Sequence, residues 1–241
     1  MMGKCGVHTM RKMVIMVMVM LMMKSADGVD TNPVLSPCDD AKINRWDGFT
    51  FGLAFSSKEA FFLNENQLSP CDSRLALATK NAQLALFRPK VDEISLLTID
   101  STAFNPIMYG GYMVAFAGRK YAARSTPTMV ADNTHTVTNF TLVLEFQEGT
   151  LQNLFWMSFG CDTCSGDSSV CVNNTVCAVP NTKCKQFGGN TDCNLSIQLT
   201  FSGTDKNREV LNSWYEVKNL RKYSLFNLYS NAVDSATVQP Q

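Results

Sequence analysis

Apolar and polar residues alternate along most of this 241-residue chain, and a period of two is typical of a β-strand with one face in a core. From Phe49 to Phe55 aromatic and aliphatic residues alternate with small or polar ones, which predicts a first strand just after Trp46. Between Phe140 and Phe146 the alternation is equally regular. Runs of similar spacing lie at 74–79, 81–89, 92–100, 112–121, 150–159 and 193–203.

These strands predict a single all-β domain at 46–241, built as an antiparallel β-sandwich or jelly roll. Polar turns separate the three runs between 74 and 100, so a meander of hairpins is the simplest interpretation. The run at 112–121 is apolar on both faces, which predicts a strand buried on both sides. From Glu209 the apolar spacing becomes three to four residues. That change predicts one amphipathic helix, or a helix followed by an edge segment from Ser224.

The N-terminus has the pattern of a signal peptide at 1–28. Three basic residues precede the apolar run 13–23, and small residues precede a cleavage site after Gly28. The run is too short for a helix that crosses the hydrocarbon core of a membrane. Residues 29–45, which contain two prolines, are then expected to form an extended arm. The alternative is an uncleaved signal anchor, which would make the chain a membrane-tethered structural protein.

Six of the nine cysteines fall within the polar segment 161–193, which we expect to leave the sheet as a disulfide-rich excursion between two core strands. This segment has too few apolar side chains to hold itself folded, so cross-links must hold it. A zinc site would need a second pair spaced like Cys161 and Cys164, and the later spacings supply none. Signal cleavage removes Cys5 and leaves an even number, as complete pairing requires, although the pairing itself stays open. The cysteines expected in disulfides are Cys38, Cys71, Cys161, Cys164, Cys171, Cys177, Cys184 and Cys193.

The charge balance gives no sign of a nucleic-acid partner. The precursor has 21 Lys and Arg against 21 Asp and Glu, and without residues 1–28 the counts are 17 and 20, a net charge of −3. A near-neutral, mildly acidic domain has no general attraction to a polyanion. No second long apolar run is present, so we expect no membrane contact after signal cleavage.

Residues for catalysis are few, and we expect no catalytic residue, cofactor or metal site. His135 is the one histidine outside 1–28, and no G-x-S-x-G elbow or free cysteine accompanies it, so we interpret it as a loop or strand-edge residue. Carboxylates remain as a possible acid and base for glycoside hydrolysis, although solvated surface charges are the simpler interpretation. The carboxylates considered are Asp92, Glu93, Glu145, Glu148 and Asp205.

Two groups of residues are candidates for ligand binding. A basic cluster could grip an acidic sugar or a phosphate, unless it is only a polar strand end. The tryptophans could stack on sugar rings if exposed, unless they belong to the core. The basic candidates are Arg119, Lys120 and Arg124, and the aromatic ones are Trp46, Trp156 and Trp214.

Three N-x-S/T triplets predict N-glycosylation, at Asn139, Asn173 and Asn194. Asn173 lies in the cysteine-rich segment, whereas Asn139 and Asn194 lie on the polar faces of predicted strands. Glycans there would require those faces to meet water, which fits a sheet that is wet on one side.

Several long blocks resemble a plant-specific family of secreted proteins known as EXPP-type precursors. The blocks lie at 45–62, 68–75, 87–100, 110–125, 140–156 and 199–217. The resemblance covers nearly the whole mature chain and implies an extracellular or cell-surface location in a land plant. It implies no activity, because the family has no assigned catalytic residues.

Secretion, dense disulfides and sequons together predict a non-enzymatic extracellular glycoprotein that binds cell-wall carbohydrate or another surface protein. One alternative is a carboxylate-dependent cell-wall glycoside hydrolase, which would need two carboxylates in one cleft. The other is the signal-anchored structural protein described above.

Overall fold

The computed structural model describes residues 29–161, 164, 169–172 and 174–222. The signal-peptide prediction, the sequon at Asn173 and the edge segment predicted from Ser224 lie outside these residues. Of the helices that the model describes, none is long and apolar enough to span a membrane.

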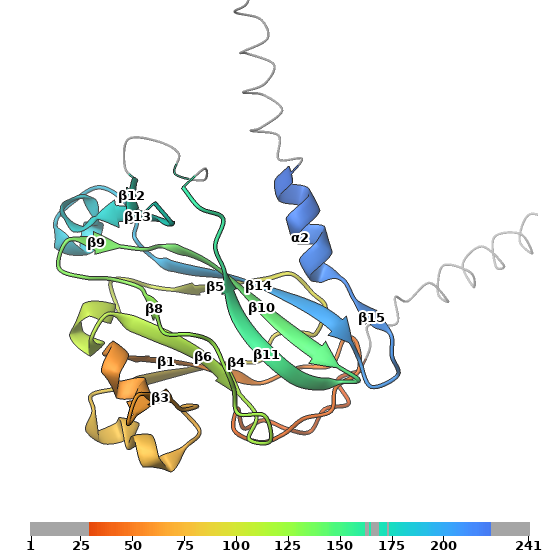
Figure 1. Ribbon diagram of the computed structural model, residues 1–241. Helices are drawn as coiled ribbons and strands as arrows, with labels where there is room; N and C mark the ends of the chain where they lie inside the picture. The colour runs from red at the N-terminus through yellow and green to blue at the C-terminus, as the bar shows by residue number, and fades with distance from the viewer. Residues whose placement is uncertain (1–28, 162–163, 165–168, 173, 223–241) are drawn as a thin grey trace, which may run out of the picture.

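Two five-stranded β-sheets pack face to face and form a sandwich, which confirms the all-β prediction (Figure 1). The first sheet has the order β4-β1-β6-β7, with β8 also paired to β6, and the second has the order β11-β10-β14-β15, with β5 also paired to β14. The first sheet contains β1 (Phe51–Ser56), β4 (Gln83–Phe87), β6 (Tyr112–Ala117), β7 (Ala123–Arg124) and β8 (Thr128–Met129). The second contains β5 (Ser95–Ile99), β10 (Asn139–Gln147), β11 (Thr150–Met157), β14 (Leu195–Thr204) and β15 (Val210–Leu211).

Smaller elements make up the rest of the chain that the structure describes. Two short sheets contain β2 (Phe62–Leu63) with β3 (Asn66–Gln67), and β12 (Val170–Val172) with β13 (Val176–Pro180) and β9 (His135–Thr136). The 3-10 helices are Lys58–Phe61, Ser73–Leu75, Leu77–Thr79, Pro106–Tyr109, Asn181–Lys183 and Lys185–Phe187, and one α-helix, α2, covers Ser213–Lys222.

The alternating apolar residues of β1, β10 and β14 meet in the core between the sheets, as the sequence predicts. Phe49 packs edge-on against Phe146, with ring centroids 5.0 Å apart, and Phe146 stacks on Phe201 at 6.2 Å. All six residues of β1 are buried, and five of the six in β6, so both strands are covered on two faces. The prediction of a two-sided strand at 112–121 is thereby confirmed.

The outer face of the first sheet is covered by residues 57–82, where the prediction of a strand at 74–79 is wrong. Two 3-10 turns occupy that segment because Ala76, between them, has a left-handed backbone (φ 48°). Leu75 and Leu77 alternate like strand residues but insert together into a small second core. The Cys38–Cys71 disulfide joins the N-terminal arm to this cover.

The meander predicted for 74–100 is also wrong. β4 pairs with β1 in the first sheet, whereas β5 pairs with β14 in the second, so the chain crosses from one sheet to the other between them. Val91 is fully buried in this crossing, and Asp92 has a left-handed backbone (φ 64°) that redirects the chain. Apolar alternation identified both strands but could not tell which partners they have.

β10 and β14 are parallel neighbours, whereas the other strand pairs are antiparallel. A parallel pair needs a long crossover, because the chain must return to the end at which it started. Here the crossover consists of β11 and the cysteine-rich excursion, which lies at one end of the sandwich (Figure 1).

Three disulfides hold the excursion, and the Cys38–Cys71 bridge makes four, so complete pairing of the eight cysteines is confirmed. The pairs within the excursion are Cys161–Cys171, Cys164–Cys177 and Cys184–Cys193. Its hairpin β12–β13 is joined to the rest of the protein by pairing of β13 with β9.

The C-terminal helix begins later than the apolar spacing predicts. Val210 and Leu211 pair with the end of β14, and the helix starts at Ser213. The Asp92 carboxylate fixes this start by accepting the backbone N–H groups of Asn212 (2.7 Å) and Ser213 (2.8 Å). A polar contact from a distant loop therefore sets the boundary, and the local spacing does not show it.

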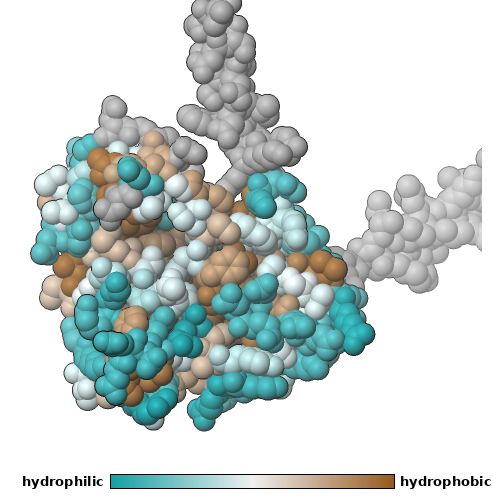
Figure 2. Space-filling view, viewed as in Figure 1, coloured by the Kyte–Doolittle hydropathy of each residue, from teal (hydrophilic) through white to brown (hydrophobic). Residues whose placement is uncertain are grey.

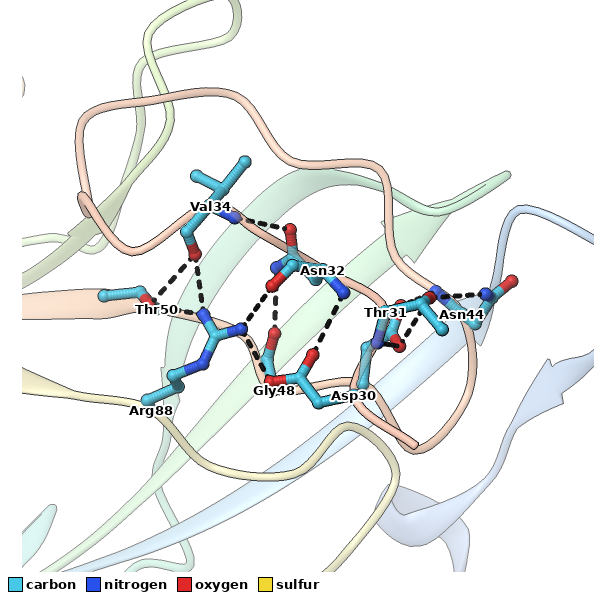
Figure 3. A network of polar contacts seen from close by, with 9 residues as sticks. Asp30, Thr31, Asn32, Val34, Asn44, Gly48, Thr50 and Arg88 are labelled. Atoms are coloured by element: carbon cyan, nitrogen blue, oxygen red, sulfur yellow. Dashed lines mark hydrogen bonds and ion pairs between the residues drawn. The ribbon is translucent and has the colours of Figure 1, made fainter. Parts of the chain in front are cut away.

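The N-terminal arm is held by the guanidinium of Arg88 (Figure 3). Its two terminal nitrogens donate to the carbonyl oxygens of Val34 and Asn32, both at 2.6 Å. They also donate to Thr50 Oγ1 at 2.8 Å and to Asp30 Oδ2 at 2.7 Å. One planar cation thus gathers four acceptors on two segments, a geometry that an ammonium cannot reproduce.

We expect Arg88→Lys to lower the free energy of unfolding by about 1–3 kcal/mol, because several charge-assisted hydrogen bonds are lost at once. Arg74→Lys is the matched control, since Arg74 makes an exposed ion pair with Asp72, and we expect no measurable change there. Denaturant unfolding of the oxidised proteins measures both, and equal effects would contradict this role of Arg88.

We expect Gly203→Ala to be more damaging than Gly188→Ala. Both glycines have a left-handed backbone (φ 92° and 90°), but a Cβ at Gly203 would lie 1.8 Å from the carbonyl oxygen of Phe146, whereas nothing lies within 4 Å of one at Gly188. The backbone cost common to both is about 1–2 kcal/mol, and the clash adds about 1–3 kcal/mol at Gly203. Losses of equal size in denaturant unfolding would show that β10 and β14 are not so close there.

Candidate functional site

A groove of about 600 Å³ lies at the end of the second sheet, where β10 begins and β11 ends. The space-filling view shows a recessed area of tan and white residues beneath the excursion, while the rim below it is teal (Figure 2). Ligand pockets commonly measure about 300–1,000 Å³, so the groove has the size for a small ligand.

The floor of the groove is the outer face of the second sheet. Thr141 of β10 lies between Gln198 of β14 and Met157 of β11 in the strand register, and Leu96 of β5 lies beyond Gln198. These four side chains form one row across four strands. The parallel pairing of β10 with β14 is therefore what places hydroxyl and amide groups beside each other here.

A second row of the floor contains Asn139 and Ser196, which are direct neighbours in the parallel register. Asn139 is exposed, and its Nδ2 donates to the adjacent Thr138 Oγ1 at 3.1 Å. Each residue belongs to a sequon, so the two glycosylation signals meet at one place on the sheet.

The wall of the groove comes from the excursion. Ser158 Oγ donates to the carbonyl oxygen of Thr175 at 3.0 Å, which joins the segment after β11 to the β12–β13 hairpin. The disulfide of Cys177, with Cys164, holds that hairpin from the other side. Phe159 also lines the wall, and its ring lies 6.5 Å from that of Trp214 in α2.

At the other side the groove reaches the gap between the two sheets. Phe140 and Trp156 pack edge-on with centroids 5.6 Å apart, and Thr126 and Thr128 approach from the first sheet. The buried Nε1 of Trp156 has no hydrogen-bond acceptor among the described protein atoms. Since an indole N–H usually finds a partner when buried, this donor is left unsatisfied, and a bound acceptor reaches it only if the side chains around it move.

No described residue that lines the groove carries a charge. The lining combines aromatic rings with hydroxyl and amide groups, each of which can donate and accept hydrogen bonds. Such a surface can stack against the apolar face of a sugar ring and bond to its hydroxyls. Its described residues offer no counter-ion to an acidic ligand and no pair of carboxylates for acid–base catalysis.

The three tryptophans lie at different places. Trp156 lines the groove and Trp214 lies behind its wall, whereas Trp46 is elsewhere, with the guanidinium of Arg45 4.6 Å and the ammonium of Lys90 5.4 Å from its ring centroid. Trp46 is 37% exposed. One of the three predicted platforms therefore belongs to the groove itself.

The three basic candidates do not line the groove. Arg124 donates from its guanidinium to the carbonyl oxygens of Ala122 (3.0 Å) and Gln67 (2.6 Å), so it holds backbone. Arg119 and Lys120 are exposed, and their backbone N–H groups donate to the carboxylate of Asp40 at 2.8 and 2.9 Å. The cluster is a polar loop end, pinned by a carboxylate from the arm.

Two of the five candidate carboxylates hold backbone. Asp205 is buried and accepts N–H groups from Arg45, Asn207 and Glu209, at 2.8–2.9 Å. Asp92, which holds the start of α2, also forms a 2.8 Å ion pair with the Arg45 side chain.

The three glutamates of that set lie at the surface. Glu148 pairs with Arg208 at 3.1 Å in the exposed β10–β11 turn, and Glu93 and Glu145 are exposed. None of the three lines the groove in the described part of the chain.

His135 lies in β9, where it pairs with Pro180 of the excursion. Its Nδ1 is 2.8 Å from Thr134 Oγ1, and the preceding turn is closed by Asp132. Burial alone would raise the pKa of Asp132, but hydrogen bonds from Thr134 and from the His135 backbone lower it below its usual range. An ionised carboxylate therefore holds this turn. His135 lies in the short strand that follows the turn, which agrees with its interpretation as a loop or strand-edge residue.

The sequence did not identify Thr141, Gln198, Ser196 or Phe159 as site residues. They meet because of a parallel register and an excursion wall, neither of which local spacing reveals. Among the described residues no group of three or more His, Cys, Asp or Glu side chains is arranged to hold a metal ion.

If Asp205 serves structure, Asp205→Asn should lower the free energy of unfolding by about 1–3 kcal/mol, because one buried backbone N–H then faces an amide N–H₂. Glu145→Gln is the control, since that side chain is exposed on β10, and we expect a change within about 0.5 kcal/mol. Denaturant unfolding checks both, and a stable Asp205→Asn protein would contradict the assignment.

Comparison with models of protein families finds a match. Two segments, residues 8–136 and 131–232, match the model of a protein family described as Uncharacterised protein DDB_G0273449. No curated protein and no solved structure matches the chain. Because the two matched segments together cover nearly its whole length, the chain belongs to the family described as Uncharacterised protein DDB_G0273449.

Proposed function

We propose that this protein is a secreted, non-enzymatic binding protein whose groove holds a neutral oligosaccharide. The observation that carries the proposal is the uncharged lining formed by the described residues, in which aromatic rings lie beside hydroxyl and amide groups. A neutral sugar needs both kinds of contact, because its ring has apolar C–H faces and a polar rim of hydroxyls.

The proposed location outside the cytoplasm rests on the four disulfides together with the signal-peptide pattern at 1–28. A plant-type extracellular setting, as the sequence resemblance implies, would supply neutral cell-wall polysaccharides as partners. A protein partner is the less favoured choice, since a recessed groove of about 600 Å³ differs from the broad interfaces that proteins form.

The hydrolase alternative has less support. It requires two carboxylates on either side of one sugar, and Asp92 and Asp205 instead hold backbone N–H groups. An acidic ligand at Arg119 and Lys120 is a separate possibility that salt dependence distinguishes, because binding to exposed cations weakens as salt screens the charges.

We expect the chain produced in the oxidising bacterial periplasm, where it carries no N-glycan, to bind neutral oligosaccharides of the cell-wall type on a glycan array and in calorimetry. Trp156→Phe should weaken binding by about threefold to tenfold, since it removes stacking area and the Nε1–H donor but keeps the packing against Phe140. Trp46→Phe is the matched control and should leave the affinity unchanged.

Binding should also be insensitive to salt, because no charged side chain lines the described groove. The proposal would be wrong if no neutral oligosaccharide binds, if the Trp46→Phe protein loses affinity as much as the Trp156→Phe protein, or if binding is confined to acidic sugars and lost in high salt.

A further inference from the structure

We propose that the groove is occupied in the mature protein by the chain's own N-linked glycan, attached at Asn139, which competes with external sugar. The inference rests on the proposed function for the class of ligand, a neutral sugar. It adds a modification site and an occupant.

The first observation is the place of the sequon. Asn139, Phe140 and Thr141 make up the triplet, and all three line the groove. Asn139 is exposed, so the atom to which a glycan is joined, Nδ2, is at the surface. Its single described hydrogen bond is to the neighbouring Thr138, which a glycosylated amide can give up at little cost.

The second observation is the direction in which a glycan would start. Asn139 shares its face of the sheet with Thr141, and Ser196 lies next to it on β14. The innermost sugar attached at Asn139 therefore begins on the floor of the groove. The sequon at Asn194 differs, because Asn194 does not line the groove and its Oδ1 accepts two hydrogen bonds from Ser101, at 2.8 and 3.1 Å.

The third argument is chemical and energetic. The two innermost sugars of an N-glycan are neutral N-acetylglucosamines, which suit a groove whose described lining is uncharged and includes the ring of Trp156. A short covalent link gives an effective concentration on the order of millimolar, so a site with a Kd of about 1 mM is about half filled by the attached glycan, and a tighter site is filled further. An external sugar of similar affinity then binds about twofold or more weakly.

The test uses the full chain secreted from a eukaryotic host, with ¹³C-labelled glycans. The control is an Asn139→Gln, Asn66→Thr double variant, which moves the sequon to Asn64 in the turn between β2 and β3, away from the groove. Glycopeptide mass spectrometry should find sugar on Asn139. Carbon relaxation should then show the innermost sugar restrained at Asn139 and freely moving at Asn64.

A competition experiment uses N,N′-diacetylchitobiose as the probe. We expect it to bind the unglycosylated periplasmic chain and to bind the glycosylated chain at least about twofold more weakly. Trimming the glycan with an endoglycosidase, which leaves the protein sequence unaltered, should not release the first sugar from its restraint.

An unmodified Asn139, or a glycan at Asn139 as mobile as one at Asn64, would overturn this inference, although an external neutral sugar could still bind the unglycosylated groove. Conversely, a restrained glycan with no binding of free oligosaccharides would contradict the proposed function and the competition, and would leave standing only the occupation of the groove by the attached glycan.

Discussion

The parallel pairing of β10 with β14 is the constraint on which the rest of the structure depends. Neighbouring parallel strands cannot be joined by a tight turn, so the chain must return to the end at which β10 begins before β14 can start. It returns along β11, which pairs with the other edge of β10, and then crosses to β14 through the excursion. The excursion has little core of its own, and three disulfides hold it in the position where it forms the wall of the groove.

Polar side chains have different roles at the two ends of the sandwich. At the opposite end of the sandwich, charged groups are used to hold backbone. Arg88 gathers the carbonyls of the arm, and the buried Asp92 and Asp205 accept N–H groups of neighbouring loops. The described residues that line the groove are uncharged: they include hydroxyls, amides and aromatic rings, together with the apolar Leu96, Met157 and Val176. The Asp132 carboxylate also holds backbone, at the turn before β9, but it does not line the groove. The uncharged lining is the basis of the proposal that the groove binds a neutral ligand.

Local pattern predicted much of the fold. The alternation through Phe49–Phe55 and Phe140–Phe146 identified the two central strands, and the cysteine count predicted complete disulfide pairing. Local pattern did not predict which strands pair with each other. The meander predicted for 74–100 is wrong, because the chain crosses between the sheets at the buried Val91 and β5 joins the second sheet. The predicted start of the C-terminal helix is wrong for a related reason, because a contact with Asp92, which is distant in the sequence, sets where α2 starts.

The candidate site was even less visible in the sequence. Of the six residues proposed for binding, Trp156 alone lines the groove, because exposure and neighbours depend on register rather than on residue type. The groove emerged when β10 and β14 placed Thr141 beside Gln198 and Asn139 beside Ser196. The sequons were the local sequence pattern that marked the groove face of the sheet, because Asn139 is the first residue of β10, one of the strands that form the floor.

The most direct measurement is an indole ¹H–¹⁵N spectrum of the unglycosylated protein, titrated with a neutral oligosaccharide. Three tryptophans give three indole signals, so one spectrum contains its own controls. The account predicts that the Trp156 signal moves with saturation as its Nε1–H gains an acceptor, while the Trp46 signal stays in place. A shift confined to Trp46, or no shift of Trp156 at saturating sugar, would contradict it.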